Sequence, residues 1–171
     1  NAFTGLNQHT GNWPGKTVSN ASGIFKYKDN IYKIYDLPGI YSILAHSEEE
    51  VVARDFICFG NSNLTVLVCD ACSLMRNLNL VLQVTEITKN VIVCVNLMDE
   101  AKKKGINIDL VKLSDLLGVK VVGTSARSGK GLDILAKTID KYKENNKDVI
   151  KIKYIDTFEK AISIVEKVIK E

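Results

Sequence analysis

The chain has 171 residues, of which 46% are hydrophobic and 25% charged, with a formal net charge of +3. These values are typical of one soluble globular domain with a core of its own. Positive and negative charges are interspersed along the chain, so the composition predicts no nucleic-acid-binding surface. No apolar run approaches the roughly 18 residues of a membrane-spanning helix.

Four cysteines are present: Cys58, Cys69, Cys72 and Cys94. Cys69 and Cys94 lie in apolar runs typical of strands, where cysteine is usually a small buried hydrophobic side chain. Cys69 and Cys72 form a C-x-x-C pair, but the two histidines do not stand at zinc-ligand spacing from it. The pattern favours reduced, structural cysteines and a cytosolic setting.

The first segment, residues 1–5, is typical of a helix end stopped by Gly5, and a polar loop over residues 7–18 follows it. Gly15-Lys16-Thr17 in this loop resembles the end of a phosphate-binding G-x-x-x-x-G-K-[S/T] motif. The first glycine of that motif would stand at position 10, which is Thr10. We also predict no strand before the loop and no helix after it, and we therefore reject the motif.

Two strands are predicted at residues 24–27 and 31–35, joined by a turn at 28–30. Beyond them, continuous apolar runs predict strands covered on both faces, and apolar residues at helical spacing predict helices. The predicted strands are residues 64–70, 91–95 and 119–122, and the predicted helices are 47–60, 74–87, 110–117 and 132–142. This alternation predicts an α/β fold with a mostly parallel sheet, flanked by helices, and one early hairpin.

A charged, linker-like stretch follows at residues 143–148, and residues 155–169 predict a separate amphipathic helix. We therefore predict one domain over residues 1–147 and the beginning of a second, helical one over residues 148–171.

The motif Asp36-Leu37-Pro38-Gly39 follows the second predicted strand, where ligands bind in open α/β sheets. A carboxylate at this place can hold the water shell of Mg²⁺. A glycine three residues later lets its amide approach a phosphate without hindrance from a Cβ. D-x-x-G alone is common by chance, so its weight depends on later motifs.

Asn96-Leu97-Met98-Asp99 follows a predicted buried strand. A carboxylate at Asp99 can accept hydrogen bonds from both N1–H and N2–H₂ of guanine, whereas adenine lacks these donors and would leave the carboxylate unpaired. Asn96 can tie neighbouring loops together. The alternative is that Asp99 merely caps a helix.

Ser125-Ala126 follows the next predicted strand. Its backbone amides could meet guanine O6, and its small side chains would let the base come close. The alternative is an ordinary turn. Three motifs in this order, each at a strand end, favour a guanine-nucleotide site; a flavodoxin-like or response-regulator fold ranks last because it would make two of them accidental.

These motifs resemble those of Ras-like P-loop GTPase domains. The segments at residues 11–18, 36–42, 52–55, 76–83 and 96–101 are similar to the G domain of ferrous iron transport protein B (FeoB). The G-N-W-P-G-x-T-V loop at 11–18 is specific to that family, and the resemblance extends to about residue 135.

The resemblance implies roles for individual residues. Thr17 and Gly39 would contact the γ-phosphate and serve catalysis, with Thr17 and Asp36 also holding Mg²⁺. Gly11 and Trp13 match backbone carbonyls that help to hold K⁺ in members that use it. The GTP- or GDP-binding residues would be Gly15, Lys16, Thr17, Val18, Ser19, Asp36, Leu37, Pro38, Gly39, Asn96, Leu97, Met98, Asp99, Ser125 and Ala126.

The family's first strand and phosphate loop would lie before Asn1 and are absent from this sequence. The chain does not begin with Met, so we expect it to start partway into a longer polypeptide. The family continues into helical and transmembrane domains, which would be this domain's partners, with self-association kept open. The parent would lie in the bacterial inner membrane with this domain on the cytoplasmic side.

Position 40, where many GTPases carry a glutamine that orients water, is Ile40. We therefore expect slow GTP hydrolysis assisted by backbone groups and a monovalent cation. The leading hypothesis is a GTP-hydrolysing regulatory domain of a bacterial Fe²⁺ transporter. The second is a non-hydrolysing, G-domain-like binding module that acts through protein contacts.

Overall fold

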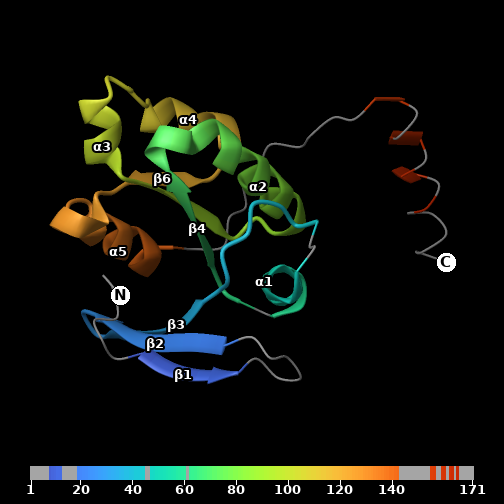
Figure 1. Ribbon diagram of the computed structural model, residues 1–171, viewed down its shortest axis with the longest axis horizontal. Helices are drawn as coiled ribbons and strands as arrows, with labels where there is room; N and C mark the ends of the chain where they lie inside the picture. Colours follow the sequence, from blue (N-terminus) through green and yellow to red (C-terminus); the bar gives the residue numbers. More distant parts are fainter. Residues whose placement is uncertain are drawn as a thin grey trace.

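The computed structural model describes residues 8–12, 19–44, 47–60, 62–142 and, near the carboxyl end, 155–156, 159–160, 162–163 and 165. These residues form two three-stranded sheets packed with helices (Figure 1). The helix end predicted at 1–5, the linker at 143–148 and the domain boundary at 147 lie outside the described residues.

The first sheet is antiparallel, with β1 (Gln8–Asn12), β2 (Ser19–Tyr27) and β3 (Asn30–Asp36) in that order. The hairpin of β2 and β3 confirms the prediction, and Lys28 takes a φ of 51° in its turn. The prediction that no strand lies in the polar stretch 7–18 is wrong. β1 forms there because its backbone pairs with β2, from Gln8 against Gly23 to Asn12 against Ser19, and this pairing does not require apolar side chains.

The second sheet is parallel, with β4 (Thr65–Asp70), β5 (Val91–Asn96) and β6 (Lys120–Gly123) in that order. All three strands lie close to their predicted positions. Within the described residues the two sheets share no ladder, so the prediction of one mostly parallel sheet holds only for the second half. The first three strands depart from it because short connections join them, and short connections reverse the chain.

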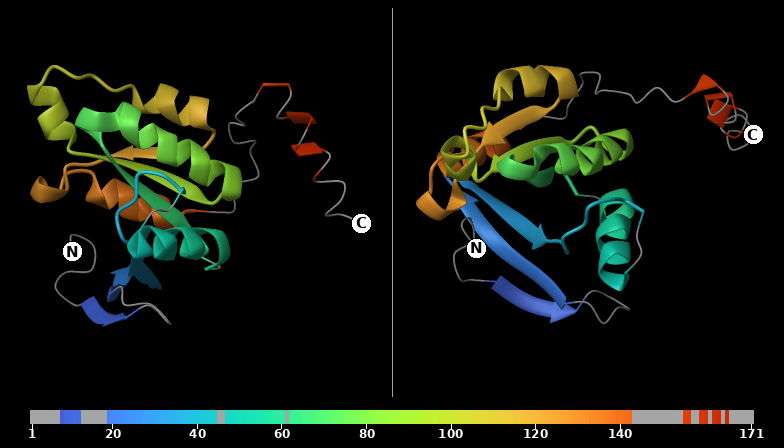
Figure 2. Two further views of the ribbon diagram at one scale, coloured as in Figure 1. Left: turned by 45° about the vertical axis from the view of Figure 1, so that its right-hand side comes forward. Right: turned by 45° about the horizontal axis from the view of Figure 1, so that its top comes forward.

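The described helices are α1 (Glu48–Phe59), α2 (Leu74–Ile87), α3 (Met98–Lys103), α4 (Leu110–Leu117) and α5 (Leu132–Asp140). Helices α2, α3 and α4 cover one face of the parallel sheet and α5 the other, while α1 lies beside the antiparallel sheet (Figures 1 and 2). The sequence predictions do not include α3, which is short. Lys102, Lys103 and Lys104 at its end are exposed.

The core lies on both faces of β5. Val91, Val93 and Val95 pack on the side of α2 and α4, whereas Ile92 and Cys94 pack on the side of α5. All five are buried. A central parallel strand covered on both faces needs this continuous apolar run, which is why the sequence located it well.

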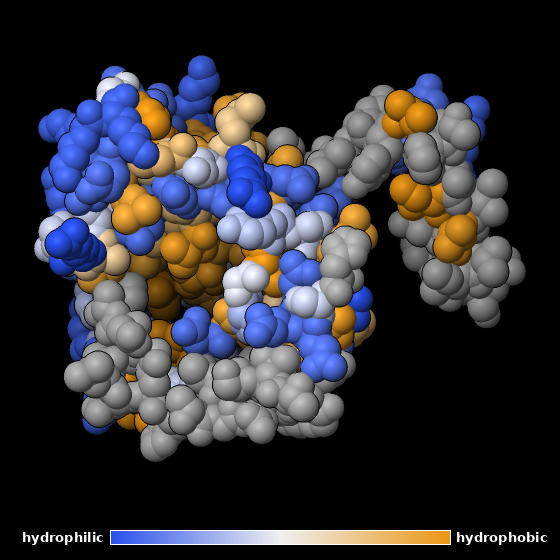
Figure 3. All heavy atoms as spheres, in the orientation of Figure 1, coloured by the Kyte–Doolittle hydropathy of each residue, from blue (hydrophilic) through white to orange (hydrophobic). Residues whose placement is uncertain are grey.

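Strand β4 departs from that pattern. Leu67 and Cys69 are buried, but Val68 between them is 67% exposed. The prediction that this strand is covered on both faces is therefore wrong at Val68, because α5 packs over β5 and β6 and leaves this part of β4 uncovered. Figure 3 shows a hollow with an apolar floor in the region between the two sheets.

In the helix predicted at 155–169, the Glu159 amide donates to the Ile155 carbonyl oxygen at 3.2 Å, which closes one helical turn. Most of that prediction falls outside the described residues. Across the described part of the chain, no helix combines the length and the apolar character needed to cross a membrane.

Helix α1 begins after Ser47, where the sequence predicts a helix start, and it carries a complete capping box. The Ser47 hydroxyl accepts from the Glu50 amide at 3.2 Å, and the Glu50 carboxylate accepts from the Ser47 amide at 3.2 Å. Gly60 ends the helix. These bonds satisfy amides that have no partner within the helix.

We predict that Ser47→Ala lowers the free energy of unfolding by about 1 kcal/mol, because it removes the acceptor for the Glu50 amide. The control is Ser73→Ala: Ser73 holds the same N-cap position on α2 but makes no side-chain cap bond. Chemical denaturation should show a loss for the first variant and almost none for the second. Equal losses would contradict the capping account.

Candidate functional site: a guanine-recognition edge

The predicted base-reading residues come together where β5 and β6 end. Asn96 is the last residue of β5, and its Oδ1 accepts from the Ala126 amide at 3.0 Å and from the Thr124 hydroxyl at 3.1 Å. Thr124 is 2% exposed and follows β6 directly. Asn96 thus ties the two strand ends together, as its position in the sequence suggested.

Asp99 lies beside the second strand end. Its amide donates to the Ser125 hydroxyl at 3.1 Å, and a hydrogen bond from Ser125 is the largest cause of the lowered pKa of the Asp99 carboxyl. Lys103 lowers this pKa further through its charge. The side chain is therefore a carboxylate at neutral pH, the form that accepts hydrogen bonds from a base.

The alternative assignment of Asp99 as a helix cap is wrong. Leu97 takes the N-cap position of α3, with a left-handed φ of 63°, and Asp99 stands in the first turn. Left-handed backbone is uncommon for leucine. It is held here because the following amide, that of Met98, donates to the Thr124 carbonyl oxygen at 3.1 Å.

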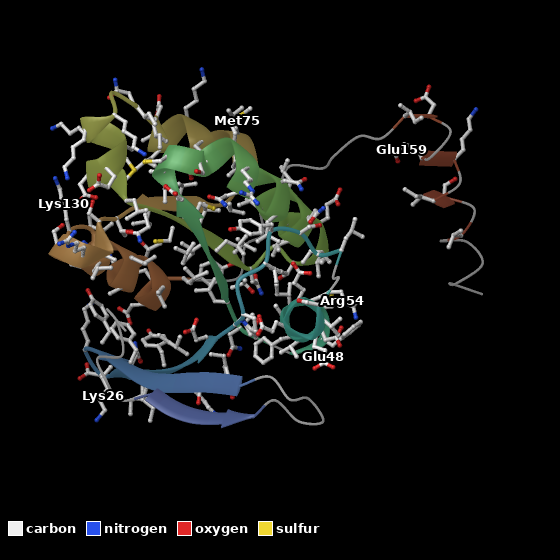
Figure 4. All side chains as sticks on the ribbon, in the orientation of Figure 1. Lys26, Glu48, Arg54, Met75, Lys130 and Glu159 are labelled. Carbon is white, nitrogen blue, oxygen red and sulfur yellow. The ribbon has the colours of Figure 1, made fainter. Side chains whose placement is uncertain are left out.

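The Ser125-Ala126 segment opens a short 3₁₀ turn, Ala126–Ser128. The Ser125 amide donates to the Lys130 carbonyl oxygen at 2.9 Å, and the Ala126 amide donates to Asn96. Figure 4 places Lys130 at the end of the molecule where α3 and α5 lie. Both amides therefore already have acceptors in this structure, so a hydrogen bond from either of them to guanine O6 would have to be shared.

Gly131 closes this turn. It has a φ of +80°, and a Cβ there would overlap the Gly123 carbonyl oxygen at the end of β6. The close approach lets α5 begin directly behind the Ser125-Ala126 turn. The sequence analysis missed Gly131, as it missed Thr124; the G-K-G pattern after Ser125 was the available signal.

Asp36 is the last residue of β3 and is exposed. The segment after the D-x-x-G motif is held against α2: the Gln83 side-chain oxygen accepts from the Ser42 hydroxyl at 3.1 Å and from the Ile43 amide at 2.9 Å. The Arg76 guanidinium lies 4.1 Å from the centre of the Tyr41 ring. The sequence analysis assigned no contact to Gln83.

Several of the predicted site residues belong to the front of the chain. Trp13, Gly15, Lys16, Thr17 and Val18 lie outside the described residues. Of the others at the front of the chain, Gly11 is in β1 and pairs with Asn20, and Ser19 begins β2 opposite Asn12. Leu37 and Pro38 are half-buried after β3, and Gly39 is exposed with open space where a Cβ would stand.

An exposed carboxylate such as Asp36 suits Mg²⁺, which keeps several waters and is commonly held by one or two carboxylates plus substrate phosphates. The described residues contain no group of three or more His, Cys, Asp or Glu side chains that could enclose a metal by themselves. Burial raises the pKa of Cys69 to about 11, so this thiol is protonated at neutral pH and is a poor nucleophile. This agrees with structural cysteines, all four of which are free thiols.

We predict that Gly131→Ala destabilises the protein by about 3 kcal/mol or more, since it adds an overlap with the Gly123 carbonyl to left-handed strain. Gly129→Ala is the matched control, because Gly129 also has a positive φ of +72° but has open space around its Cβ position. It should cost only about 1 kcal/mol. Similar thermal unfolding midpoints for the two variants would contradict the close approach of Gly131 to the Gly123 carbonyl oxygen.

We also predict that Ser125→Ala raises the pKa of the Asp99 carboxyl toward its ordinary value of 3.8. Because the folded-state pKa is lowered, the stabilisation is present above pH 3.8 and is lost as the pH falls through the lowered pKa. Carbon NMR titration of the Asp99 carboxyl measures the shift. Ser128→Ala, in the same turn, is the control, and an unchanged Asp99 pKa in Ser125→Ala would contradict the assignment.

A family model described as ferrous iron transport protein B matches residues 1–139. The Fe(2+) transport protein A/Fe(2+) transporter FeoB fusion protein of Porphyromonas gingivalis is 36% identical over 173 residues, 98% of this chain and 20% of that protein. The Fe(2+) transporter FeoB of Legionella pneumophila is 38% identical over 143 residues, 81% of this chain and 19% of that protein. The chain spans about a fifth of the length of these relatives.

Among solved structures, the cytosolic domain of the T. maritima FeoB iron transporter in a GDP form superposes with a TM-score of 0.93 and 38% identity, over 100% of this chain and 68% of that chain. The same domain in a GMPPNP form gives a TM-score of 0.91 at the same identity and coverage. The T. maritima G domain gives 0.77 at 41% identity, over 83% of this chain and 87% of that one. The chain therefore belongs to the ferrous iron transport protein B family, in the part that forms the N-terminal G domain.

Proposed function

We propose that this chain binds guanine nucleotides and hydrolyses GTP slowly, as the cytoplasmic regulatory domain of a bacterial Fe²⁺ transporter in the inner membrane. The observation that carries the proposal is the Asn96–Asp99–Ser125 arrangement at the ends of β5 and β6. The related T. maritima domain in GDP and GMPPNP forms supports the choice of ligand.

Recognition of the base would rest on Asp99. Its carboxylate can accept from N1–H and N2–H₂ of guanine together, and Ser125 keeps it ionised and oriented. Adenine offers neither donor, so it would leave a desolvated carboxylate unpaired. Asn96 acts by holding the Ala126 amide in place, and that amide would reach guanine O6 only by sharing its hydrogen between O6 and Asn96.

The phosphates would lie near Asp36 and Gly39. Asp36 would hold Mg²⁺ through water, and the Gly39 amide would contact the γ-phosphate. Mg²⁺ would supply charge neutralisation at the phosphates. Thr17, with Gly15, Lys16, Val18 and Ser19, would complete this side, and the carbonyls of Gly11 and Trp13 would help to hold K⁺.

We further propose that a strand and the phosphate loop precede Asn1 in the natural protein. Val68 of β4 is 67% exposed, and the two sheets lie side by side without a shared ladder in the described residues. A further parallel strand between β3 and β4 would pair with β4 and join the sheets. Residues 148–171 would then begin a helical domain that leads to the transmembrane part.

Slow turnover is expected because Ile40 cannot orient a water molecule. The Gly39 amide, Thr17 and a monovalent cation would supply what the side chain at position 40 does not. The second candidate is a binding module that takes up GTP without hydrolysing it and acts through the helical and transmembrane domains or through self-association.

The test is a titration of fluorescent GDP with Mg²⁺ into the protein that includes the residues preceding Asn1, and into the 171-residue chain as a comparison. Displacement by GTP and not by ATP is the expected result for the longer form, with weaker binding for the shorter one. Equal displacement by ATP, or no binding by the longer form, would overturn the proposal. Binding without phosphate release would select the second candidate.

A further inference from the structure

Asp140, the last residue of α5, receives three donors from the β2–β3 hairpin. Its Oδ1 accepts from Asn30 Nδ2 at 2.7 Å and from the Tyr32 hydroxyl at 2.8 Å, and its Oδ2 lies 3.4 Å from Lys28 Nζ. The side chain of Asp140 is only 9% exposed, although the cluster lies at the surface. Figures 1 and 2 show α5 lying over this hairpin.

This placement does not serve the helix itself. A carboxylate at a helix C-terminus faces the negative end of the helix dipole, where a cation is preferred. Asp140 is nevertheless an anion, since hydrogen bonds from Asn30 and Tyr32, with smaller contributions from Lys28, lower the pKa of its carboxyl. The cost to the helix is offset by the contacts with the hairpin, so the residue acts between elements.

The end of α5 is itself fixed to the parallel sheet. Leu135 is buried against β5 and β6, and Ile139 packs against the same cluster. The Tyr142 hydroxyl donates to Asn90 Oδ1, just before β5, at 3.0 Å. Asp140 therefore connects a firmly anchored helix to a hairpin that shares no ladder with the parallel sheet in the described residues.

The hairpin leads directly to the phosphate side of the proposed site. Strand β3 begins at Asn30, a partner of Asp140, and ends at Asp36, the first residue of D-x-x-G. Its seven residues span about 20 Å. The segment beyond it is held by Gln83 on α2. The segment from Asn30 to Ile43 is thus held at both of its ends, and the proposed nucleotide contacts at Asp36 and Gly39 lie between these two anchors.

We propose that Asp140 is a positioning residue that sets where β3 presents Asp36 and Gly39, and that it couples the nucleotide state to the end of α5, from which the chain continues toward residue 171. The inference rests on the proposed function, because it needs Asp36 and Gly39 to contact nucleotide. Coupling of this kind is reciprocal. If GTP and GDP stabilise the Asp140 contacts to different extents, then removal of these contacts must change the affinity for GTP relative to that for GDP.

The experiment measures the dissociation constants of a fluorescent non-hydrolysable GTP analogue and of fluorescent GDP, in the protein that includes the residues preceding Asn1. Asp140→Ala should change the ratio of the two constants by about fivefold or more. Tyr32→Phe, which removes one hydroxyl, should change it in the same direction by less. The control is Asp133→Ala, an exposed carboxylate in the first turn of the same helix, which should leave the ratio unchanged.

A lower thermal midpoint with an unchanged ratio would show a merely structural role and overturn the inference. If Asp140→Ala does not fold, the same ratio of dissociation constants is measured in Tyr32→Phe and Asn30→Ala, and an unchanged ratio in both overturns the inference. If the wild-type protein binds guanine nucleotides but no variant changes the ratio of the two dissociation constants, this inference alone is overturned. Wild-type protein that binds none would overturn the proposed function as well.

Discussion

The proposed site depends on one side-chain oxygen. Oδ1 of Asn96 accepts from both Thr124 and Ala126, and it thereby fixes the end of β6 against the end of β5. Ser125 stands between those two donors and hydrogen-bonds Asp99, so the position of the carboxylate follows from the same constraint. Buried or half-buried polar groups of this kind stabilise one arrangement only when every member is paired.

Among the described residues, the two sheets differ in how they are covered and held. The parallel sheet has helices on both faces and a core around β5. Among the described residues, Asp140 holds the β2–β3 hairpin, Gln83 holds the segment after β3, and the Tyr35 ring of β3 packs against Phe56 of α1 at 5.2 Å. In the proposed function, the base would be recognised at the parallel sheet, and the phosphates would be contacted after the antiparallel sheet. This division suits a nucleotide switch, because the base can stay bound while the phosphate side moves.

Local signals predicted these helices well: Ser47 marks the beginning and Gly60 the end of α1, and apolar spacing located α2 and α4. The sequence did not predict β1, whose polar residues are held by backbone pairing with β2, nor the exposure of Val68, which depends on which elements pack over β4. Of the candidate site, the positions of Asn96 and Asp99 could be predicted because they follow a buried strand. The acceptor of the Ala126 amide could not be predicted, because it depends on the distance between the ends of β5 and β6.

The role of Asp99 in base recognition can be tested through the base preference of Asp99→Asn. Asparagine places an amide NH₂ where guanine presents N2–H₂, so the two donors oppose each other, whereas xanthine presents a carbonyl oxygen at that position. We expect the wild-type protein to prefer GDP to xanthosine diphosphate by orders of magnitude, and we expect Asp99→Asn to reverse this preference. A variant that keeps the preference for GDP would show that Asp99 does not contact the base and would contradict the account.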